Sequence, residues 1–110
     1  MEPALHDGDI LTLRTDPLAL RRLKHGDVVV LRHPWRPSLK LVKRIAGVPG
    51  DYLTPDGRPA APDAEVAGWR LGDREYFVIS DNRAAGLDDS RRFGPVPHRL
   101  IEGRLVIGDR

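Results

Sequence analysis

Proline and glycine divide this chain into short segments, and this division limits its possible folds more than any other feature. Ten prolines and eleven glycines are spread over 110 residues, and no segment between them keeps a helical period over several turns. Helix interiors tolerate proline and glycine poorly, whereas short strands fit between such breaks. The sequence therefore predicts a mostly β fold with only short helical turns.

Five apolar stretches have the length and composition of strands. The stretch at 9–14 alternates between apolar and polar side chains, and that at 28–31 is a β-branched run suited to a core strand. The predicted strands cover 9–14, 28–31, 39–46, 75–79 and 105–107.

The connections between these strands carry local signals of their own. Residues 17–24 have room for one or two helical turns, and 33–37 is a loop because its prolines cannot donate to a strand ladder. The pair at 52–53 followed by Asp-Gly at 56–57 is typical of a hairpin, and 59–68 is expected to be an exposed excursion. A single domain is expected, because 110 residues are too few for two ordinary cores.

Composition excludes several classes of function. Hydrophobic residues make up 40% and charged residues 31% of the chain, which is typical of a folded soluble domain. With no cysteine there is neither a disulfide framework nor a thiolate metal site, and no apolar run approaches the roughly 20 residues that span a bilayer. The net charge is only +2 and no aromatic ladder accompanies the scattered basic residues, so nucleic acid is not an expected partner.

The histidines do not form a recognisable metal site. They lie in separate turns or loops without the short spacing of a helical metal pair, at His6, His25, His33 and His98. We therefore predict solvated surface histidines, no metal and no other cofactor.

Four segments carry the chemistry of this chain and together span almost all of it. The first two are MEPAL at 1–5 with Gly-Asp at 8–9, and GDVVV at 26–30. The others are LVKRIAGVPGD at 41–51, and YFVISDNR at 76–83 continued by DSR at 89–91 and FGPVP at 93–97. In this order the four segments resemble the signal peptidase I family, S26, of serine/lysine endopeptidases. The resemblance implies one compact signal peptidase-like/LexA-like β domain.

The resemblance also implies that Lys43 is the general base of a Ser/Lys dyad. An ordinary lysine, with a pKa of about 10.4, is already protonated near pH 7, but burial among apolar neighbours lowers that pKa. Leu41, Val42 and Ile45 supply such neighbours. Without the resemblance, an exposed lysine on a strand would be the simpler interpretation.

The nucleophile of that dyad is not in the sequence. In the family the reactive serine directly precedes the methionine of the first segment, and here that methionine is Met1. We therefore expect residues 1–110 to be an S26-like catalytic domain cut just before the nucleophilic serine position. Such a chain is expected not to cleave peptides without the upstream serine.

Two further groups of residues follow from the resemblance. A peptide substrate would bind as an added strand against Met1, Glu2, Pro3, Leu5, Leu41 and Val42. A charge-paired scaffold beneath the lysine would be formed by Asp81, Arg83, Asp89, Ser90 and Arg91, with a polar surface turn as the competing interpretation.

The last segment departs from the family pattern. Ser80 replaces the usual glycine, and Gly86 falls near the position of a serine that helps to hold the lysine in the family. One additional residue also separates Asp81 from Asp89. The support of the lysine is therefore expected to be altered.

The leading hypothesis is an endopeptidase that removes N-terminal signal or leader peptides through an acyl-enzyme. Its partner would be a protein substrate that bears such a peptide. A membrane-anchored branch would work at an extracytoplasmic site through an upstream span, which Asp81-Asn82-Arg83 favours. A short maturation branch, resembling the proteases that process nickel superoxide dismutase, would be cytoplasmic, which the short insert at 52–74 and the segment 32–37 favour.

Two other hypotheses remain open. One is a noncatalytic peptide-binding relative that acts as an assembly or scaffold module through the same groove. The other is a self-cleaving repressor, which ranks lower because those proteins lack the Asp-Asn-Arg block.

Overall fold

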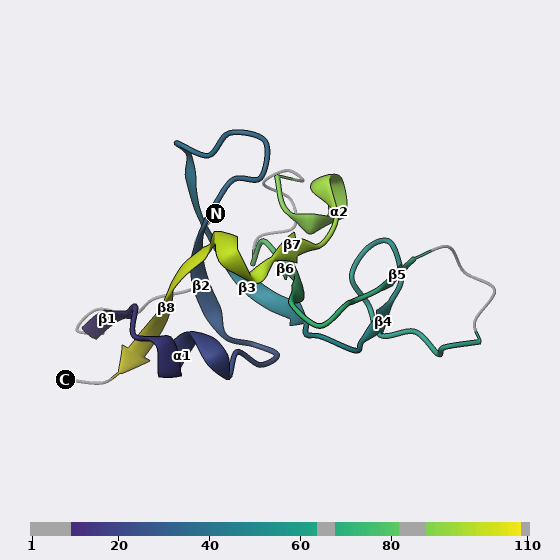
Figure 1. Ribbon diagram of the computed structural model, residues 1–110, viewed down its shortest axis with the longest axis horizontal. Helices are drawn as coiled ribbons and strands as arrows, with labels where there is room; N and C mark the ends of the chain where they lie inside the picture. Colours follow the sequence, from purple (N-terminus) through teal and green to yellow (C-terminus); the bar gives the residue numbers. More distant parts are fainter. Residues whose placement is uncertain (1–9, 64–67, 82–87, 109–110) are drawn as a thin grey trace.

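An antiparallel sheet forms the body of the protein in a computed structural model, which describes residues 10–63, 68–81 and 88–108. Within these residues the sheet has six strands in the order β1-β8-β2-β3-β6-β7, and β4 and β5 form a separate pair (Figure 1). The strands are β1 Ile10–Arg14, β2 Val28–Arg32, β3 Lys40–Gly47, β4 Tyr52–Leu53, β5 Trp69–Arg70, β6 Glu75–Ile79, β7 Val96–Pro97 and β8 Ile101–Gly108. The helical turns are α1 Pro17–Arg21, α2 Ser90–Phe93 and the 3₁₀ turn η2 His98–Leu100.

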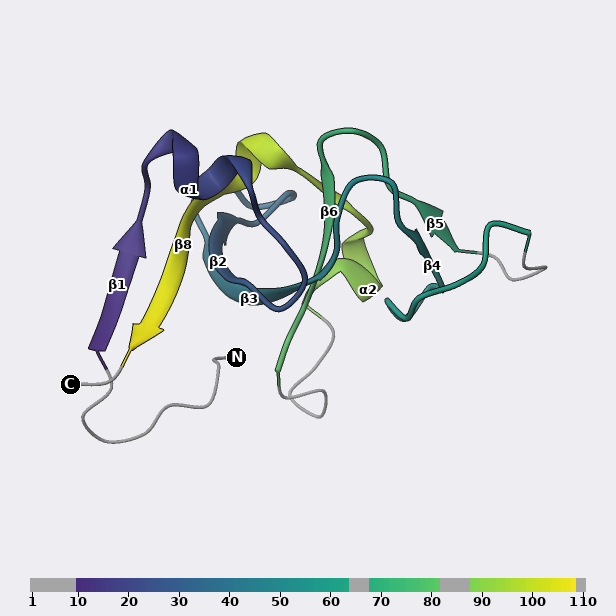
Figure 2. The same ribbon diagram turned by 90° about the horizontal axis from the view of Figure 1, so that it is seen from below.

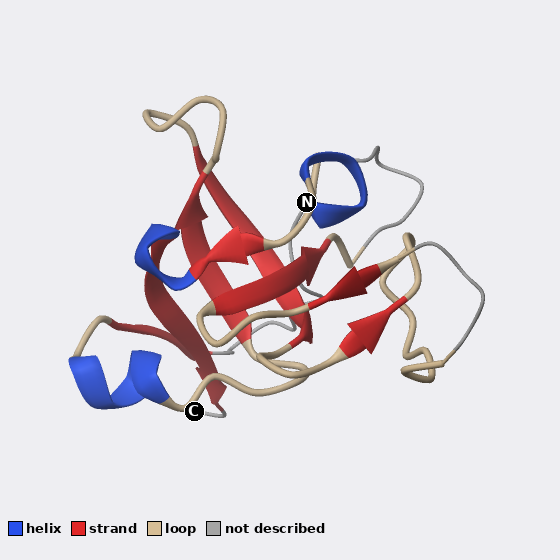
Figure 3. Cartoon of the chain, turned by 45° about the vertical axis from the view of Figure 1, so that its right-hand side comes forward, coloured by secondary structure: helices blue, strands red, loops and turns tan. Residues whose placement is uncertain are grey.

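The molecule is elongated because two ribbons extend from opposite ends of its core. The β1–β8 ribbon projects at one end and the β4–β5 pair at the other (Figure 2). All five residues of β1 are exposed, so this strand adds to the sheet without adding to the core. The helical turns lie at the periphery of the sheet (Figure 3).

Two clusters of buried side chains form the core. The larger one gathers alternate residues of the central strands, among them Val29, Leu31, Ile45 and Val78. The smaller one, where β3 runs on toward β4, consists of Leu53, Leu71 and Phe77. Burial of these apolar side chains supplies most of the driving force for folding.

Irregularities in register bend the central strands. The pairing of β2 with β8 shifts between Val30 and Leu31, and that of β3 with β6 shifts between Ile45 and Gly47. Such shifts increase the local twist of a sheet. They curl β2 and β3 around the larger cluster (Figure 2).

The predicted mostly β fold is confirmed, and each of the five predicted strands is present. The helical turn in 17–24 and the irregular segment 33–37 are also as predicted. The hairpin at 52–57 is only partly right, because Leu53 forms an isolated bridge with Pro59 while the strand partner of β4 is β5. The sequence analysis did not predict β5, β7, α2 or η2.

The glycine at the end of β3 gives a test of core packing. A Cβ on Gly47 would lie 2.9 Å from Leu71 Cδ1 and 3.1 Å from Phe77 Cβ, and it would also meet the side chain of Leu53. We expect Gly47→Ala to lower the free energy of unfolding by about 1–3 kcal/mol in urea denaturation, because these buried neighbours have little room to move. Gly108→Ala is the matched control, since no atom lies within 4 Å of a Cβ there, and an equal loss in both variants would contradict the packing argument.

Candidate active site

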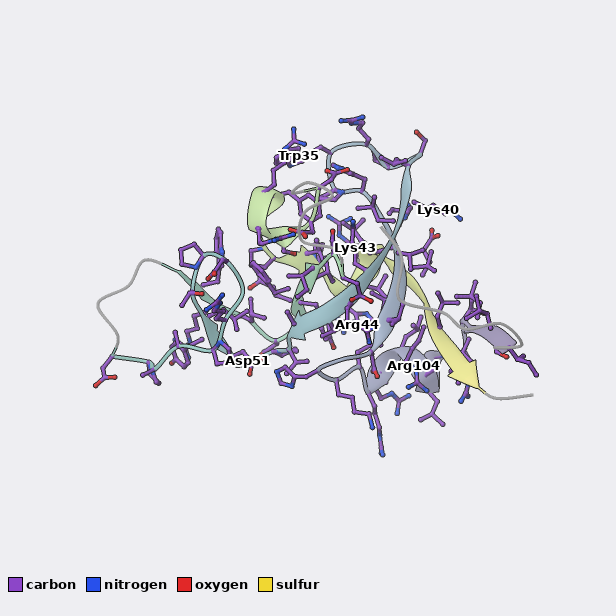
Figure 4. The ribbon with its side chains drawn as sticks, turned by 180° about the vertical axis from the view of Figure 1, so that it is seen from behind. Trp35, Lys40, Lys43, Arg44, Asp51 and Arg104 are labelled. Carbon is purple, nitrogen blue, oxygen red and sulfur yellow. The ribbon has the colours of Figure 1, made fainter. Side chains whose placement is uncertain are left out.

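The lysine of the third segment lies in the middle of β3 and points into the protein. Lys43 shares the buried face of the strand with Ile45 and Gly47 and is only 6% exposed. Its neighbour Arg44 is on the opposite, partly exposed face (Figure 4). The interpretation of Lys43 as an exposed strand lysine is therefore wrong.

A hydroxyl group holds the buried amine. Lys43 Nζ donates a hydrogen bond to Ser80 Oγ over 2.9 Å, and Ser80 is itself 3% exposed. The serine directly follows β6, the strand that pairs with β3. The sequence predicted an altered support for the lysine, because Gly86 falls near the position of the family's supporting serine. Among the described residues, Ser80 holds the amine.

The surroundings of Lys43 favour its neutral form. Burial lowers the pKa of Lys43 below its ordinary value, and this effect outweighs the nearby carboxylates of Asp89 and Asp88, which raise it. The guanidinium of Arg91 lowers the pKa further. The pKa of Lys43 is thus shifted in the direction that a lysine general base requires.

A completely buried carboxylate lies next to this pair. Asp89 accepts hydrogen bonds from the backbone N–H groups of Ser80 and Arg91, each over 2.9 Å, and from Arg91 Nη2 over 2.6 Å. Burial alone would raise the pKa of Asp89, but these donors hold it below its usual value. The carboxylate is therefore ionised at neutral pH, and it also forms the N-cap of α2.

Two further contacts fix the ends of the last segment. Ser90 is buried, and its hydroxyl accepts the N–H of Val78 over 2.9 Å, which ties α2 to β6. On the other side of the sheet, Asp81 accepts two hydrogen bonds from Arg44 over 2.8 and 2.9 Å, and this guanidinium lowers the pKa of Asp81. Asp81 and Asp89 are thus both paired with arginines, while their role as a scaffold beneath the lysine stays a prediction.

The predicted substrate wall is only partly described. Leu41 and Val42 are half-buried on β3, immediately before Lys43. The other predicted wall residues are Met1, Glu2, Pro3 and Leu5, and they lie outside the described residues, as do Arg83 and Gly86. The closeness of the Lys43 amine to Met1 therefore stays a prediction.

The sequence analysis missed a second buried polar group near the site. His33 is 1% exposed, although it was predicted to be solvated. Its Nδ1 accepts the backbone N–H of Trp35 over 3.1 Å, so Nε2 carries the proton and donates to Asp88 over 2.9 Å. An edge-to-face contact with Phe93, at 5.2 Å between ring centres, completes its burial. The prediction was wrong because two of its partners, Asp88 and Phe93, lie far away in the sequence.

Comparisons with known proteins show which proteins this chain is similar to. The family model described as "Signal peptidase, peptidase S26" matches residues 1–58. Mitochondrial ATP-independent inner membrane protease subunit 1a of Arabidopsis thaliana is 36% identical over 104 residues, which cover 88% of this chain and 61% of that protein. Signal peptidase I of Bacillus licheniformis is 28% identical over 127 residues, which cover 94% of this chain and 68% of that protein.

A solved structure shows the same fold. The crystal structure of a signal peptidase I from Enterococcus faecalis has a TM-score of 0.55 and 22% sequence identity, and the match covers 74% of this chain and 95% of that one. The chain spans 61–62% of the length of the mitochondrial subunit 1 relatives from Arabidopsis and Xenopus tropicalis. Among the residues that the structure describes, no helix is long and apolar enough to cross a membrane.

The two carboxylates of the last segment should differ strongly in their contribution to stability. We expect Asp89→Asn to lower the free energy of unfolding by about 3 kcal/mol, because it removes a fully buried negative charge that is bonded to the largely buried Arg91 guanidinium. Asp81→Asn, which breaks a partly exposed pair, is expected to cost less than about 1 kcal/mol. The folded pKa of Asp89 is lowered, so its contribution is lost as the pH falls through that pKa, and urea titrations of Asp89→Asn and wild type should converge in acid. Equal losses in both variants would contradict this ranking.

Burial of Lys43 should carry a cost in stability. Since its folded pKa is below its unfolded value, the unfolded chain binds more protons between the two values, and stability rises with pH across that window. Lys43→Met should therefore raise the urea midpoint at pH 6, and its advantage over wild type should shrink as the pH approaches 10. Lys40→Met, at an exposed position on the same strand, is the control, and an advantage that does not change with pH would contradict this account.

Proposed function

This chain belongs to the signal peptidase family, peptidase S26, and from that premise we propose that residues 1–110 are the catalytic domain of a serine endopeptidase that removes N-terminal signal or leader peptides. The observation that carries the proposal is Lys43, a lysine buried in the sheet with a lowered pKa and a hydrogen bond to a buried hydroxyl. Burial of an ammonium group costs stability, so a buried lysine is more readily explained by a function than by a contribution to folding.

The proposed reaction is acyl transfer with Lys43 as the base. The nucleophile is a serine placed directly before Met1, whose hydroxyl oxygen attacks the scissile carbonyl while its proton passes to Lys43 Nζ. The protonated lysine then gives the proton to the leaving amine, and an ester joins the substrate to the serine. Lys43 next takes a proton from water, whose oxygen attacks the ester. The bond between the acyl carbon and the serine oxygen then breaks, the proton passes from Lys43 to that oxygen, and the acid and the free serine are released.

The free edge of β3 supports a substrate that binds as an added strand. In the described residues β3 pairs with β2 from Lys40 to Arg44, and its register with β6 begins only at Arg44 and Ile79. Among the residues that the structure describes, the segment 40–42 therefore has no strand partner on its second side. An extended peptide bound there would lie against Leu41 and Val42 and place its carbonyl beside Lys43.

The names of the relatives suggest where such substrates are met. The similar proteins from Arabidopsis thaliana and Xenopus tropicalis are named as subunits of mitochondrial inner membrane proteases. We propose the corresponding setting for this chain, in which it acts at a membrane surface on exported or sorted proteins. The shorter maturation branch and a cytoplasmic site are the alternative.

Restoring the nucleophile tests the proposed activity. The chain extended upstream with a serine directly before Met1 and with the residues that precede it in the gene should cleave a leader peptide that has a small residue before the scissile bond. Lys43→Ala in the extended protein should lower kcat by about 10³-fold or more, because the serine then has no base. The chain without the serine should be inactive.

Lys24→Ala is the matched control, since Lys24 is exposed and lies in the connection between α1 and β2, and it should leave kcat unchanged. Full activity of Lys43→Ala would refute the mechanism. An extended protein that binds leader peptides but cleaves none in a broad library would instead support the noncatalytic peptide-binding module.

A further inference from the structure

We infer that Ser80 is the positioning residue of the site: its hydroxyl fixes Lys43 Nζ in the orientation that a base requires. This inference rests on the proposed role of Lys43. Ser80 stands where the resembled segment has glycine, so this is a property of the present chain and cannot be carried over from the family pattern.

The register of the sheet explains why residue 80 reaches the lysine. Arg44 is paired with Ile79 and Ile45 with Val78, so the next antiparallel position places Ser80 opposite Lys43. Residues that face each other in this way have their Cβ atoms about 5 Å apart and point to the same side of the sheet. The 2.9 Å hydrogen bond is therefore a direct cross-strand contact.

The backbone of Ser80 is fixed independently of the lysine. Its N–H donates to Asp89 Oδ2 over 2.9 Å, and Asp89 is in turn held by the guanidinium of Arg91. Ser80, Asp89 and Arg91 are all largely or completely buried, with little freedom to move. The serine thus transmits the position of a buried ion pair to Lys43 Nζ.

The contact suits a base better than it suits a second nucleophile. A neutral amine that donates one N–H to Ser80 keeps its lone pair free for the proton of another hydroxyl. Ser80 itself is only 3% exposed, so a peptide carbonyl cannot approach its oxygen without a rearrangement of the strand.

The charged groups around Lys43 set the direction of the expected change. Asp88 and Asp89 favour its protonated form, and Arg91 disfavours it. The Ser80 hydroxyl also favours the ammonium, because a hydrogen bond to a charged donor is stronger than one to a neutral donor. Removal of this hydroxyl should therefore lower the pKa of Lys43 further.

The test follows the ε-CH₂ signals of lysine by ¹³C NMR during a pH titration. The chain has three lysines, at positions 24, 40 and 43, so Lys43→Arg assigns the signal. Ser80→Ala should move the Lys43 midpoint to lower pH by about one unit. Ser90→Ala removes an equally buried hydroxyl that bonds to Val78 instead, and it should lower thermal stability without moving this midpoint.

In the extended, active protein, Ser80→Ala should lower kcat by about tenfold with KM unchanged, and the acidic limb of the pH profile should follow the NMR midpoint. An unchanged Lys43 midpoint in folded Ser80→Ala would overturn the inference, and so would covalent labelling of Ser80 by a fluorophosphonate. The titration needs no peptidase activity, so the two proposals can fail separately. A shifted midpoint in a protein that cleaves nothing would support the coupling of Ser80 to Lys43 and would contradict the proposed function. Full cleavage by Ser80→Ala with an unchanged Lys43 midpoint would support the proposed function and contradict the coupling.

Discussion

The candidate site depends on one fully buried carboxylate. Asp89 has no exposure to solvent, yet its oxygens are held by two backbone amides and by the guanidinium of Arg91. Burial of an ion is costly unless its charge and its lone pairs are satisfied. The hydrogen bonds that satisfy this carboxylate also cap α2 and fix the backbone of Ser80. The position of Lys43 therefore depends on Asp89, through the hydrogen bonds of Ser80 with both residues.

Lys43 and Arg44 show how one strand places two adjacent basic side chains in different surroundings. Side chains alternate between the faces of a strand, so adjacent residues experience different dielectric surroundings. Lys43 faces the core, where burial lowers its pKa, whereas Arg44 faces Asp81 and stays charged, with its pKa raised by that partner. The pKa values of these two neighbouring residues are therefore shifted in opposite directions.

The sequence predicted the parts of the fold that rest on local patterns. Apolar runs marked the central strands, whereas β5 and β7 have two residues each and carry no periodic signal. The family resemblance implied a charge-paired scaffold that includes Asp81 and Asp89, but Ser80 was interpreted only as a replacement of the usual glycine. Its contact with Lys43 requires the register of β3 with β6, just as the burial of His33 requires Asp88, 55 positions away. Long-range pairing of this kind has no local signature.

Because Asp81 and Asp89 are each held by other parts of the protein, the arrangement of the site does not depend on the number of residues between them. Asp81 is clamped to Arg44, and Asp89 is clamped to Arg91 and Ser80, so each end is held by contacts that lie outside the intervening segment. An insertion or deletion within that segment leaves the register of Lys43 and Ser80 intact, whereas a single residue inserted into β6 would turn Ser80 to the opposite face. The number of residues in β3 and β6 is therefore what the contact between Lys43 and Ser80 depends on.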